Sequence, residues 1–272
     1  KKDFARGRLV DIVERSPMRD SPSCAHRRAG CGGCDWMHLR PVAQHEAKVE
    51  IVKESLRRIG RLDPDAVDGL VRQGGAVSQF GYRTTIRVVG GPNGSVGYRA
   101  HDSNDVVEVT SCPIAESKLS RLISVIEADE GAELTLRTSV ATGAVTAIWD
   151  RRYRKAIRGV PGEVHIGERA WLLERVSGHE VRVSAGSFFQ SGVQAAELLV
   201  AAVAAAAPEL DGAGHGVDAY GGVGLFGVAA MSSAELVTVI ESSKSACLDA
   251  RHNLAGRRAE VVHADVSGWS AP

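Results

Sequence analysis

The sequence predicts a multi-domain protein, with an α+β domain containing an antiparallel sheet followed by the first half of an α/β domain. Two observations predict this fold class. Between residues 82 and 184, strand-like runs flank turn sequences such as "GPNG" and "ATG". After residue 186, strands and helices alternate as β-α-β-α-β, which opens a parallel, doubly wound, Rossmann-like sheet. At 272 residues the chain is long enough for two or three domains.

The elements of the front part are few. A strand-like apolar run covers Leu9 to Val13, and a cysteine-rich stretch follows it. Pro41 opens a helix with apolar residues at the spacing of one helical face, and Gly60 ends it. In the middle part we expect strands over residues 82–90, 95–100, 134–140 and 145–150, interrupted by one helix over residues 115–128.

The rear part supplies the α/β pattern. A helix is expected over residues 193–207, before the strand "GVDAY" and the loop "GGVG". A second helix, the strand "LVTVIE", a helix over residues 243–254 and the strand "AEVVHAD" complete the series.

Composition and charge exclude some classes of protein. No run approaches the roughly 20 apolar residues of a membrane span, and the charged opening "KKDFARGR" is not a signal peptide. We therefore expect a cytoplasmic protein without a membrane partner. The net charge is zero, but Lys+Arg number 29 against 24 Asp+Glu before Ser191, and 4 against 9 from Ser191 onward. A basic front would suit a polyanion, although an uneven scatter of charge explains the counts equally well.

The glycine-rich stretch "DAYGGVGLFG" follows a strand and opens a helix, so its backbone can approach a ligand closely. Glu241 ends the next strand, where a carboxylate can accept hydrogen bonds from ribose hydroxyls. Asp265 ends the third strand, where an acid can meet an adenine amino group. These positions, with Gly222 in the loop, predict an adenosine-containing cofactor; a turn needed only for packing would not explain two acids at strand ends.

Two cofactors fit this loop. The segment from Gly222 to Gly227 satisfies G-x-G-x-x-G, so NAD is one of them. Asp218 lies just ahead of the loop, where a carboxylate is unfavourable beside a pyrophosphate and suits the ammonium group of an amino acid. S-adenosylmethionine contains an adenosine and an amino acid but no phosphate, and Asp218 therefore favours it.

Three of the five cysteines lie within eleven residues, at Cys24, Cys31 and Cys34, and Cys112 follows in "VTSCPI". Thiolates bind soft metals, and C-x2-C spacing places two sulfurs on one metal or cluster. The three clustered cysteines with His38 would make a zinc site. The same three with Cys112 would make an iron–sulfur site of four thiolates, which the Cys-Pro sequence at Cys112 favours.

Five motifs occur in one order: "CGGCDWMH", "FGYRTTIRV", "VTSCPI", "SFFQSG" and "VDAYGGVGLFG". Together they resemble the iron–sulfur branch of the RNA 5-methyluridine methyltransferases, and the resemblance covers nearly the whole chain. It implies a four-iron four-sulfur cluster on Cys24, Cys31, Cys34 and Cys112. It also implies contacts with S-adenosyl-L-methionine from Gln190, Tyr220, Glu241 and Asp265.

The resemblance further implies a division of the chain. Residues 1–23 would be the end of a small N-terminal RNA-binding β-barrel, and residues 24–185 a central, cluster-bearing domain that binds RNA. Residues 186–272 would be the N-terminal half of the methyltransferase domain. The family often has Cys where this chain has Gly221, a difference that we expect to matter little, and Asn where this chain has Leu225.

The chemistry implied by the resemblance begins with a cysteine thiolate that adds to uracil C6, after which C5 attacks the sulfonium methyl group and a base removes the C5 proton. The family's nucleophilic cysteine and basic glutamate have no counterpart before Pro272, and Cys247, on a predicted helix, fits a core position. We therefore expect a fragment truncated at both ends, which contains no catalytic residue and is inactive by itself.

The stretch "RRYRKAIR" has five cations around one aromatic ring, so it could bind phosphates and stack a base; a solvated charged face is the alternative. Its candidate RNA-binding residues are Arg151, Arg152, Tyr153 and Arg154, with Arg83, Arg87 and Arg99 ranked second. The resemblance favours ribosomal over transfer RNA and indicates no obligate protein partner. A non-catalytic RNA-binding or assembly module and an NAD-linked iron–sulfur oxidoreductase remain the other hypotheses.

Overall fold

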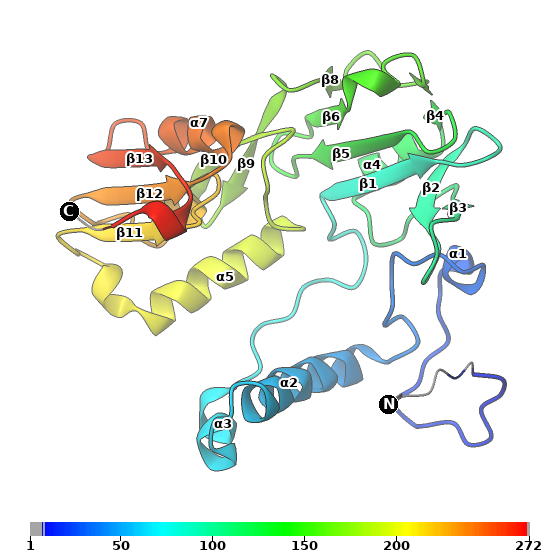
Figure 1. Ribbon diagram of the computed structural model, residues 1–272, viewed down its shortest axis with the longest axis horizontal. Coiled ribbons are helices and arrows are strands. Elements are labelled where there is room, and N and C mark those ends of the chain that lie inside the picture. The colour runs from blue at the N-terminus through cyan, green and yellow to red at the C-terminus, as the bar shows by residue number, and fades with distance from the viewer. Residues whose placement is uncertain (1–6, 8, 271–272) are drawn as a thin grey trace. The chain divides into compact units, whose positions relative to one another are not determined.

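The computed structural model describes residue 7 and residues 9–270 (Figure 1). The chain divides into two compact units, residues 1–28 with 34–73, and residues 29–33 with 74–272. Within the described ranges, none of the helices combines the length and the apolar character needed to cross a bilayer.

The first unit is helical. It contains α1 (Ala25–Arg28), α2 (Pro41–Arg58) and α3 (Pro64–Leu70). Proline opens both longer helices, because its fixed φ suits the first turn and its missing N–H is not needed there. The Asp63 side chain also caps α3 by accepting hydrogen bonds from the N–H groups of Asp65 and Ala66. The helix expected after Pro41 is thus confirmed and ends two residues before Gly60.

The strand expected over Leu9 to Val13 is wrong. The described residues of this run have no regular structure, and the side chains of Leu9, Val10 and Val13 are exposed by 69%, 89% and 100%. A strand is stable only when its backbone groups pair with a neighbour and one of its faces is buried. Neither condition is met within the described part of this segment, and its assignment to a β-barrel stays a prediction.

The second unit contains a six-stranded sheet in the order β3-β2-β1-β5-β6-β8. Its strands are β1 (Thr85–Gly90), β2 (Val96–Arg99), β3 (Val106–Glu108), β5 (Glu133–Thr138), β6 (Val145–Trp149) and β8 (His165–Ile166). All neighbours are antiparallel except β6 and β8. The expected antiparallel sheet is therefore confirmed.

The helix of this domain is shorter than expected. α4 covers Ser117–Ile123, and its Leu119 is fully buried. Residues expected to continue the helix instead form β4 (Glu127–Ala128), which pairs with β7 (Ile157–Arg158). The strand pairing with a distant segment has overridden the local helical pattern, a common way for a propensity-based boundary to fail.

A hairpin of β9 (Trp171–Val176) and β10 (His179–Ser184) follows, and its two turn residues, Ser177 and Gly178, both have positive φ. Two-residue hairpin turns of this kind match the twist of the strands. The hairpin packs in one core with α5 (Val193–Ala206). That core contains Leu172, Val176, Val181, Val183, Phe189, Ala196, Val200, Val223 and Leu225.

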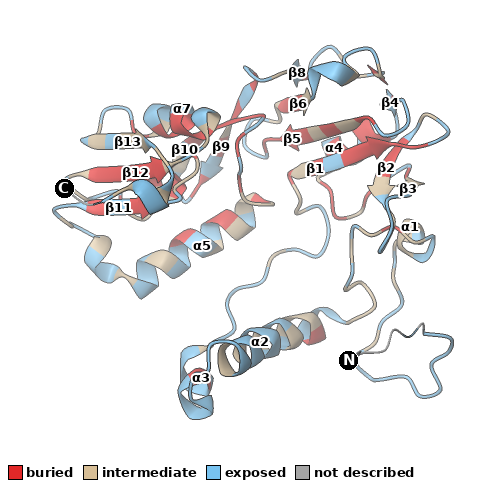
Figure 2. Cartoon of the chain, in the orientation of Figure 1, coloured by how far each residue is buried: buried red, intermediate tan, exposed pale blue. Residues whose placement is uncertain are grey.

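The last part of the second unit is a parallel sheet in the order β11-β12-β13. It contains β11 (Gly216–Ala219), α6 (Leu225–Ala229), β12 (Val237–Glu241), α7 (Lys244–Asn253) and β13 (Ala259–His263). Every residue of β12 except Glu241 is buried, as Figure 2 shows. The expected β-α-β-α-β series is confirmed, and its topology brings the carboxyl ends of three strands to one edge.

Candidate cofactor site

The loop after β11 has an unusual backbone. Tyr220, Gly222 and Gly224 have φ of +59°, +56° and +78°. Glycine adopts this region without cost, whereas a tyrosine there is strained. The strained backbone accompanies a ring that is 76% exposed. Strained residues of this kind cluster at ligand sites, which agrees with the prediction that Tyr220 contacts a cofactor.

Gly221 is constrained by space. A Cβ atom at this position would lie 2.7 Å from Cγ1 of Val239 and 2.9 Å from Cγ of Asp218. The expectation that Cys in place of Gly221 matters little is therefore wrong for this backbone, because any side chain would require the loop or its neighbours to move.

Glu241 fastens the loop to the edge of the sheet. One carboxylate oxygen accepts a hydrogen bond from the Gly222 N–H at 2.9 Å, and the other accepts from the Ser243 N–H at 2.6 Å. The first bond joins the ends of β11 and β12, and the second satisfies a donor at the start of α7. Glu241 is half-buried. Its Oε1 also accepts a hydrogen bond from the Ser242 hydroxyl at 3.4 Å, whereas Oε2 retains a lone pair for a further donor.

Asp218 lies beneath the loop. Its side chain is only 6% exposed, and it accepts a hydrogen bond from the Gly227 N–H at 3.2 Å. Burial raises the pKa of Asp218 to about 6; the Gly227 hydrogen bond acts against this shift and the charge of Glu241 adds to it. Among the described residues, no cationic side chain acts on this buried carboxyl group.

Asp265 stands beyond the end of the neighbouring strand β13. It is exposed, and its Oδ1 accepts hydrogen bonds from the Ser267 hydroxyl at 2.5 Å and from the Ser267 N–H at 2.8 Å. These two bonds lower the pKa of Asp265 below its usual value. Ala264, next to it, donates its N–H to the Glu241 carbonyl, so the predicted acids of β12 and β13 are neighbours.

Gln190 is linked to this region by the residue before it in the sequence. Phe189 is buried in the same core as Val223 and Leu225 of the glycine loop, while Phe188 is 74% exposed. Gln190 itself is half-buried. The structure thus brings together Asp218, Tyr220, Gly222 and Glu241 directly, adds Asp265 from the adjacent strand, and joins Gln190 to the loop through Phe189.

The polarity of this loop bears on the choice of ligand. A pyrophosphate would need N–H donors, but carboxylates already engage the N–H groups of Gly222 and Gly227. The negative charges of Asp218 and Glu241 would also repel a phosphate. A ligand whose groups are cations and hydroxyl donors fits better, so the arrangement favours an adenosyl amino acid over a dinucleotide.

The predicted metal-binding cysteines belong to different compact units. Cys31 and Cys112 lie in the second unit, where both are 8% exposed and both act electrostatically on the buried Tyr98 phenol. Burial raises the pKa of Tyr98, and these two thiols raise it further. Cys24 and Cys34 belong to the first unit, where the Cys34 carbonyl accepts a hydrogen bond from Arg27.

Within residue 7 and residues 9–270, no group of three or more His, Cys, Asp or Glu side chains is arranged to hold a metal ion. His38, the alternative fourth ligand, contacts the Asp35 carbonyl through Nδ1 at 3.0 Å. The donor chemistry of Cys31 and Cys112, two buried thiols near one phenol, suits a soft metal. The full ligand set stays a prediction from the spacing of the cysteines.

The predicted RNA-binding residues occupy an exposed turn, the 3-10 helix η1 (Arg151–Tyr153), which the Asp150 side chain caps. The Arg151 side chain is 92% exposed and approaches Glu168 at 4.0 Å. Arg152 lies 4.7 Å from the ring centroid of Tyr153, and Arg154 is exposed. The cations are therefore available to a solvent-borne partner.

Other cations in the RNA-binding prediction form closer ion pairs than Arg151 and Arg152, which lie 4.0 Å from Glu168 and 3.8 Å from Asp150. Arg158 contacts Asp129 at 2.7 Å and Glu127 at 3.6 Å. Arg87 and Arg99 both contact Glu133, at 2.5 and 2.8 Å. Of the second-ranked candidates, Arg87 and Arg99 thus have compensated charges, and Arg83 is half-buried. The positive potential of the segment therefore comes mainly from the exposed side chains of Arg151, Arg152, Arg154 and Lys155.

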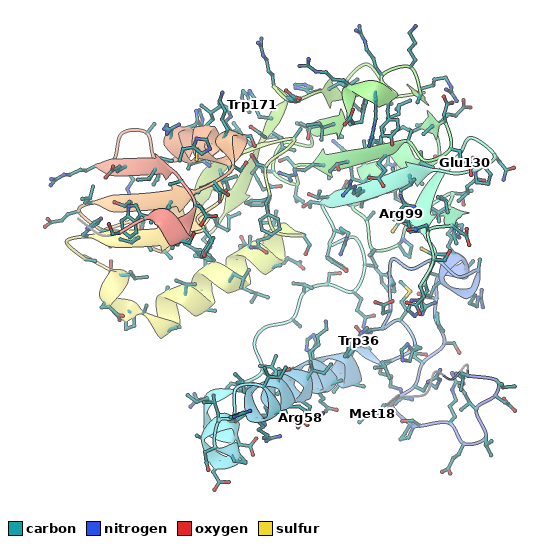
Figure 3. All side chains as sticks on the ribbon, in the orientation of Figure 1. Met18, Trp36, Arg58, Arg99, Glu130 and Trp171 are labelled. Atoms are coloured by element: carbon teal, nitrogen blue, oxygen red, sulfur yellow. The ribbon has the colours of Figure 1, made fainter. Side chains whose placement is uncertain are left out.

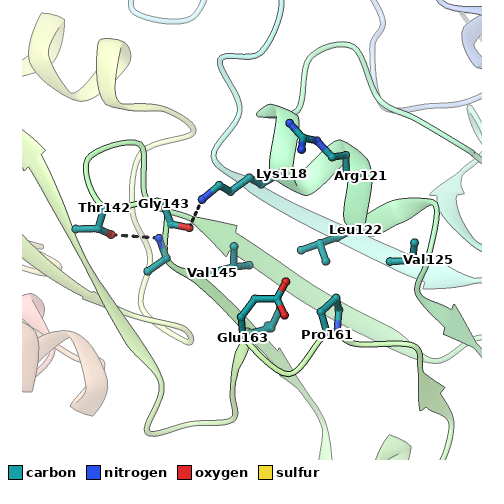
Figure 4. A pocket seen from close by; sticks show the side chains of 11 residues that line it. Lys118, Arg121, Leu122, Val125, Thr142, Gly143, Val145, Pro161 and Glu163 are labelled. Carbon is teal, nitrogen blue, oxygen red and sulfur yellow. Dashed lines mark hydrogen bonds between the residues drawn. The ribbon is translucent and has the colours of Figure 1, made fainter.

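A separate cavity of about 500 Å³ lies in the central domain (Figure 4). Lys118 and Arg121 of α4 stand at one side, and Leu122, Val145 and Pro161 contribute apolar surface. The Lys118 ammonium donates a hydrogen bond to the Gly143 carbonyl at 2.6 Å. None of the predicted cofactor-binding residues lines this cavity.

Sequence reasoning missed one buried polar group of the site region, formed by Arg137, Ser184, Ser187 and Asp249. Asp249 is fully buried on α7, and Arg137 is 4% exposed on β5. A signal existed for Asp249, since it shares the apolar helix face of Ala246 and Ala250. A charged residue on such a face is buried only when it is paired.

Together these features define a class of protein: a Rossmann-like parallel sheet whose acidic glycine loop suits a nucleoside cofactor, in one chain with an antiparallel sheet that carries an exposed basic turn. No family model matches the chain. Curated relatives do match. An uncharacterized RNA methyltransferase of Streptomyces avermitilis is 32% identical over 281 residues, which cover 93% of this chain and 64% of the relative. A second, from Streptomyces coelicolor, is also 32% identical and covers 93% and 61%.

A further relative carries a specific name. The 23S rRNA (uracil(1939)-C(5))-methyltransferase RlmD of Methylococcus capsulatus is 34% identical over 151 residues, 53% of this chain and 33% of the relative. Among solved structures, the tRNA (uracil-54, C5)-methyltransferase of Pyrococcus abyssi superposes with a TM-score of 0.64 at 22% identity. That match covers 96% of this chain and 69% of the other, and it establishes the fold.

Over most of its length the chain is similar to these RNA methyltransferases, as the resemblance of its motifs implies. It spans between three-fifths and two-thirds of the length of the two Streptomyces relatives.

Proposed function

We propose that this chain contributes the cofactor-binding and RNA-binding parts of an S-adenosylmethionine-dependent RNA methyltransferase that forms 5-methyluridine, with ribosomal RNA as substrate. The observation that carries the proposal is the acidic glycine loop. Asp218 and Glu241 occupy its N–H groups and leave carboxylate oxygens for a cationic, hydroxyl-bearing ligand. The named relatives support the choice of RNA uracil as the methylated group.

Each residue of the loop has a proposed role. Asp218 offers a buried carboxylate to the ammonium group, and Glu241 accepts hydrogen bonds from ribose hydroxyls. The exposed ring of Tyr220 covers an apolar face of the ligand, and Asp265 receives the adenine amino group. Gln190 approaches from the segment before α5. S-adenosylmethionine, when bound, supplies an electrophilic methyl group.

No residue of the described chain is proposed as the nucleophile. Cys247 is fully buried, and its thiol donates a hydrogen bond to the Glu241 carbonyl at 3.2 Å. Burial also raises the pKa of Cys247, which disfavours the reactive thiolate. The resemblance assigns the nucleophile outside residues 1–272, and on this proposal the chain alone binds the cofactor without transferring a methyl group.

The basic turn, residues 151–154, is proposed to bind the RNA backbone. The reaction is proposed to take place in the cytoplasm, where ribosomal RNA is methylated.

Cys24, Cys31, Cys34 and Cys112 are proposed to bind a four-iron four-sulfur cluster. Such a cluster would cross-link loop segments that have little regular structure of their own. Metal and sulfide analysis of anaerobically purified protein should find both elements, whereas stoichiometric zinc without visible absorption would contradict the cluster.

Cofactor choice is tested by calorimetric titration of the chain with S-adenosylhomocysteine and, separately, with NADH. We expect saturable binding of the first and none of the second. Saturable NADH binding without S-adenosylhomocysteine binding would support the oxidoreductase instead.

Methyl transfer is tested with tritiated S-adenosylmethionine and unmodified ribosomal RNA, using this chain and a version extended to match the length of the relatives. Activity in the extended version alone agrees with the proposal. Activity in the short chain would show that the nucleophile has been misplaced. Inactivity of both, on ribosomal and transfer RNA alike, would favour a non-catalytic RNA-binding module.

A further inference from the structure

A buried carboxylate outside the cofactor loop, that of Asp249, accepts hydrogen bonds from Ser184 and Ser187. Asp249 of α7 is fully buried and accepts hydrogen bonds from the Ser184 N–H at 2.8 Å and its hydroxyl at 2.7 Å. It also accepts from the Ser187 hydroxyl at 2.7 Å. A buried carboxyl group without hydrogen-bond partners would be very unfavourable, so these three hydrogen bonds compensate for the burial of Asp249.

Cations lie on two sides of this group. Arg182 approaches Asp249 at 3.1 Å, although its Nε–H makes no hydrogen bond within the described structure. Its guanidinium lies 5.0 Å from the ring centroid of Trp171, which Figure 3 labels at the start of β9. Arg137 of β5 is the second cation. Burial lowers the pKa of Arg137 to about 10, so it remains charged at neutral pH.

Arg137 holds the same two serines by their carbonyl groups. It donates hydrogen bonds to the Ser187 carbonyl at 2.6 Å and to the Ser184 carbonyl at 3.2 Å. The side chains of Ser184 and Ser187 are thus bound by Asp249 and their backbones by Arg137. Arg137 belongs to β5 of the six-stranded sheet and Asp249 to α7 beside the parallel sheet, so the network links these two parts of the second unit at this segment.

Ser184 and Ser187 lie in the segment that leads directly to Gln190. Phe189 is buried against the glycine-loop residues Val223 and Leu225. Beyond Gln190, the Ser191 carbonyl accepts a hydrogen bond from the Thr84 N–H at 2.8 Å. Gln190 is therefore held between two anchored points, with Ser187 three residues before it and Ser191 directly after it.

We infer that Asp249 and Arg137, acting through Ser187, are positioning residues that hold Gln190 against the cofactor loop. None of the three is assigned a contact with the ligand. The inference rests on the proposed function, because it requires that Gln190 binds S-adenosylmethionine. It predicts that loosening Ser187 weakens cofactor binding only while Gln190 is present.

The test is a double-mutant cycle of Ser187→Ala and Gln190→Ala in the full 272-residue chain, measured as the affinity for S-adenosylhomocysteine. Ser187→Ala removes one hydrogen bond to a buried carboxylate, so we expect about 5- to 20-fold weaker binding in the otherwise unchanged chain. In the Gln190→Ala background we expect less than about a twofold further change, because coupled residues are not additive.

The matched control is Ser139→Ala. Ser139 is also buried, and its hydroxyl donates a hydrogen bond to the Leu173 carbonyl at 2.6 Å. It should lower the melting temperature without changing the affinity. If Ser187→Ala does not fold, as judged by near-ultraviolet circular dichroism, Ser187→Cys replaces it in the cycle.

Equal losses from Ser187→Ala in both backgrounds would show a purely structural role and overturn the inference. An unchanged affinity in Ser187→Ala would do the same. If the unmodified chain does not bind S-adenosylhomocysteine, the proposed function fails first, and this inference fails with it.

Discussion

The cofactor loop and the basic turn are both charged regions of the second unit, but they are held in different ways. Asp218 and Glu241 stand at the ends of β11 and β12, and backbone N–H groups fix their carboxylates. Arg151 and Arg154 stand on a turn, with exposed side chains. A site built on strand ends is placed by the sheet itself, whereas an exposed turn offers charge without a fixed geometry.

The two regions also differ in how their charges are solvated. Asp218 is 6% exposed, so its ionised form loses most of its contact with water. The Arg151 side chain is 92% exposed and keeps that contact. Substitutions in the loop should therefore change both stability and ligand affinity, and substitutions in the turn should change only binding.

The largest effect in free energy is expected for Asp218→Asn. This substitution should raise the stability of the folded chain at pH 7 and lower its affinity for the ligand. The pKa of Asp218 rises from 3.8 to about 6 on folding. The unfolded chain releases this proton at lower pH, so stability falls as the pH rises from about 4 to about 6. At pH 7 the ionisation of Asp218 lowers the free energy of unfolding by at most about 3 kcal/mol. Asparagine cannot ionise, so the variant should unfold at higher denaturant concentration at pH 7.

The same variant should bind S-adenosylhomocysteine about 10-fold more weakly, because the ammonium group loses a charged partner. Denaturant titrations at pH 4.5 and pH 7 test the first part, and the difference between variant and parent should shrink at the lower pH. A variant that is less stable at pH 7 would show that Asp218 is compensated in the folded chain.

Glu241→Gln is expected to have the largest effect on affinity, about 30-fold weaker binding of S-adenosylhomocysteine, which in free energy is smaller than the stability change expected for Asp218→Asn. The amide has one accepting oxygen, so it cannot hold Gly222, Ser243 and a ribose hydroxyl as the carboxylate can. Glu260→Gln, an exposed substitution on β13, is the matched control and should leave the affinity unchanged. Equal affinities in all three proteins would remove Glu241 from the site.

A smaller effect is expected in the basic turn. Neutralising Arg151, Arg152 and Arg154 together with glutamine should weaken RNA binding about 10-fold at moderate salt. It should also reduce the salt slope by about 2, since each phosphate contact to a single strand contributes about 0.7. Neutralising the paired cations Arg87, Arg99 and Arg158 removes the same charge and should do less. If both triple variants bind alike, the turn is only a solvated face.

Much of the cofactor half could be predicted from the sequence, because its signals are local. The strand pattern around Asp218, the glycine loop and the acid at Glu241 each identify their own place, and parallel topology brings the strand ends together. The hydrogen bond from the Gly222 N–H to the Glu241 carboxylate could not be predicted from the sequence, because it depends on a loop backbone in which Tyr220 adopts positive φ.

The predictions that failed or stayed open concern segments that depend on distant partners. The run from Leu9 to Val13 has the composition of a strand, but the described chain offers it no neighbour. The residues after α4 have a helical pattern, but their pairing with β7 makes them a strand. The network around Asp249 joins residues more than 60 positions apart, and no spacing rule reveals such a contact.

The smallest effect is expected for Cys247→Ala, which separates the roles of buried and exposed groups within the cofactor half. Cys247 is fully buried and donates its weak hydrogen bond to the backbone of Glu241, not to its carboxylate. Removing the sulfur leaves a small cavity and should cost about 1 kcal/mol of stability, seen as a lower denaturation midpoint. Affinity for S-adenosylhomocysteine should stay within about twofold, since the Glu241 side chain keeps both of its own N–H donors.

In the extended protein, methyl transfer by Cys247→Ala should match that of the unmodified enzyme when both are folded. Loss of methyl transfer with unchanged affinity and folding would instead identify Cys247 as the reacting thiol, and would require α7 to open during the reaction.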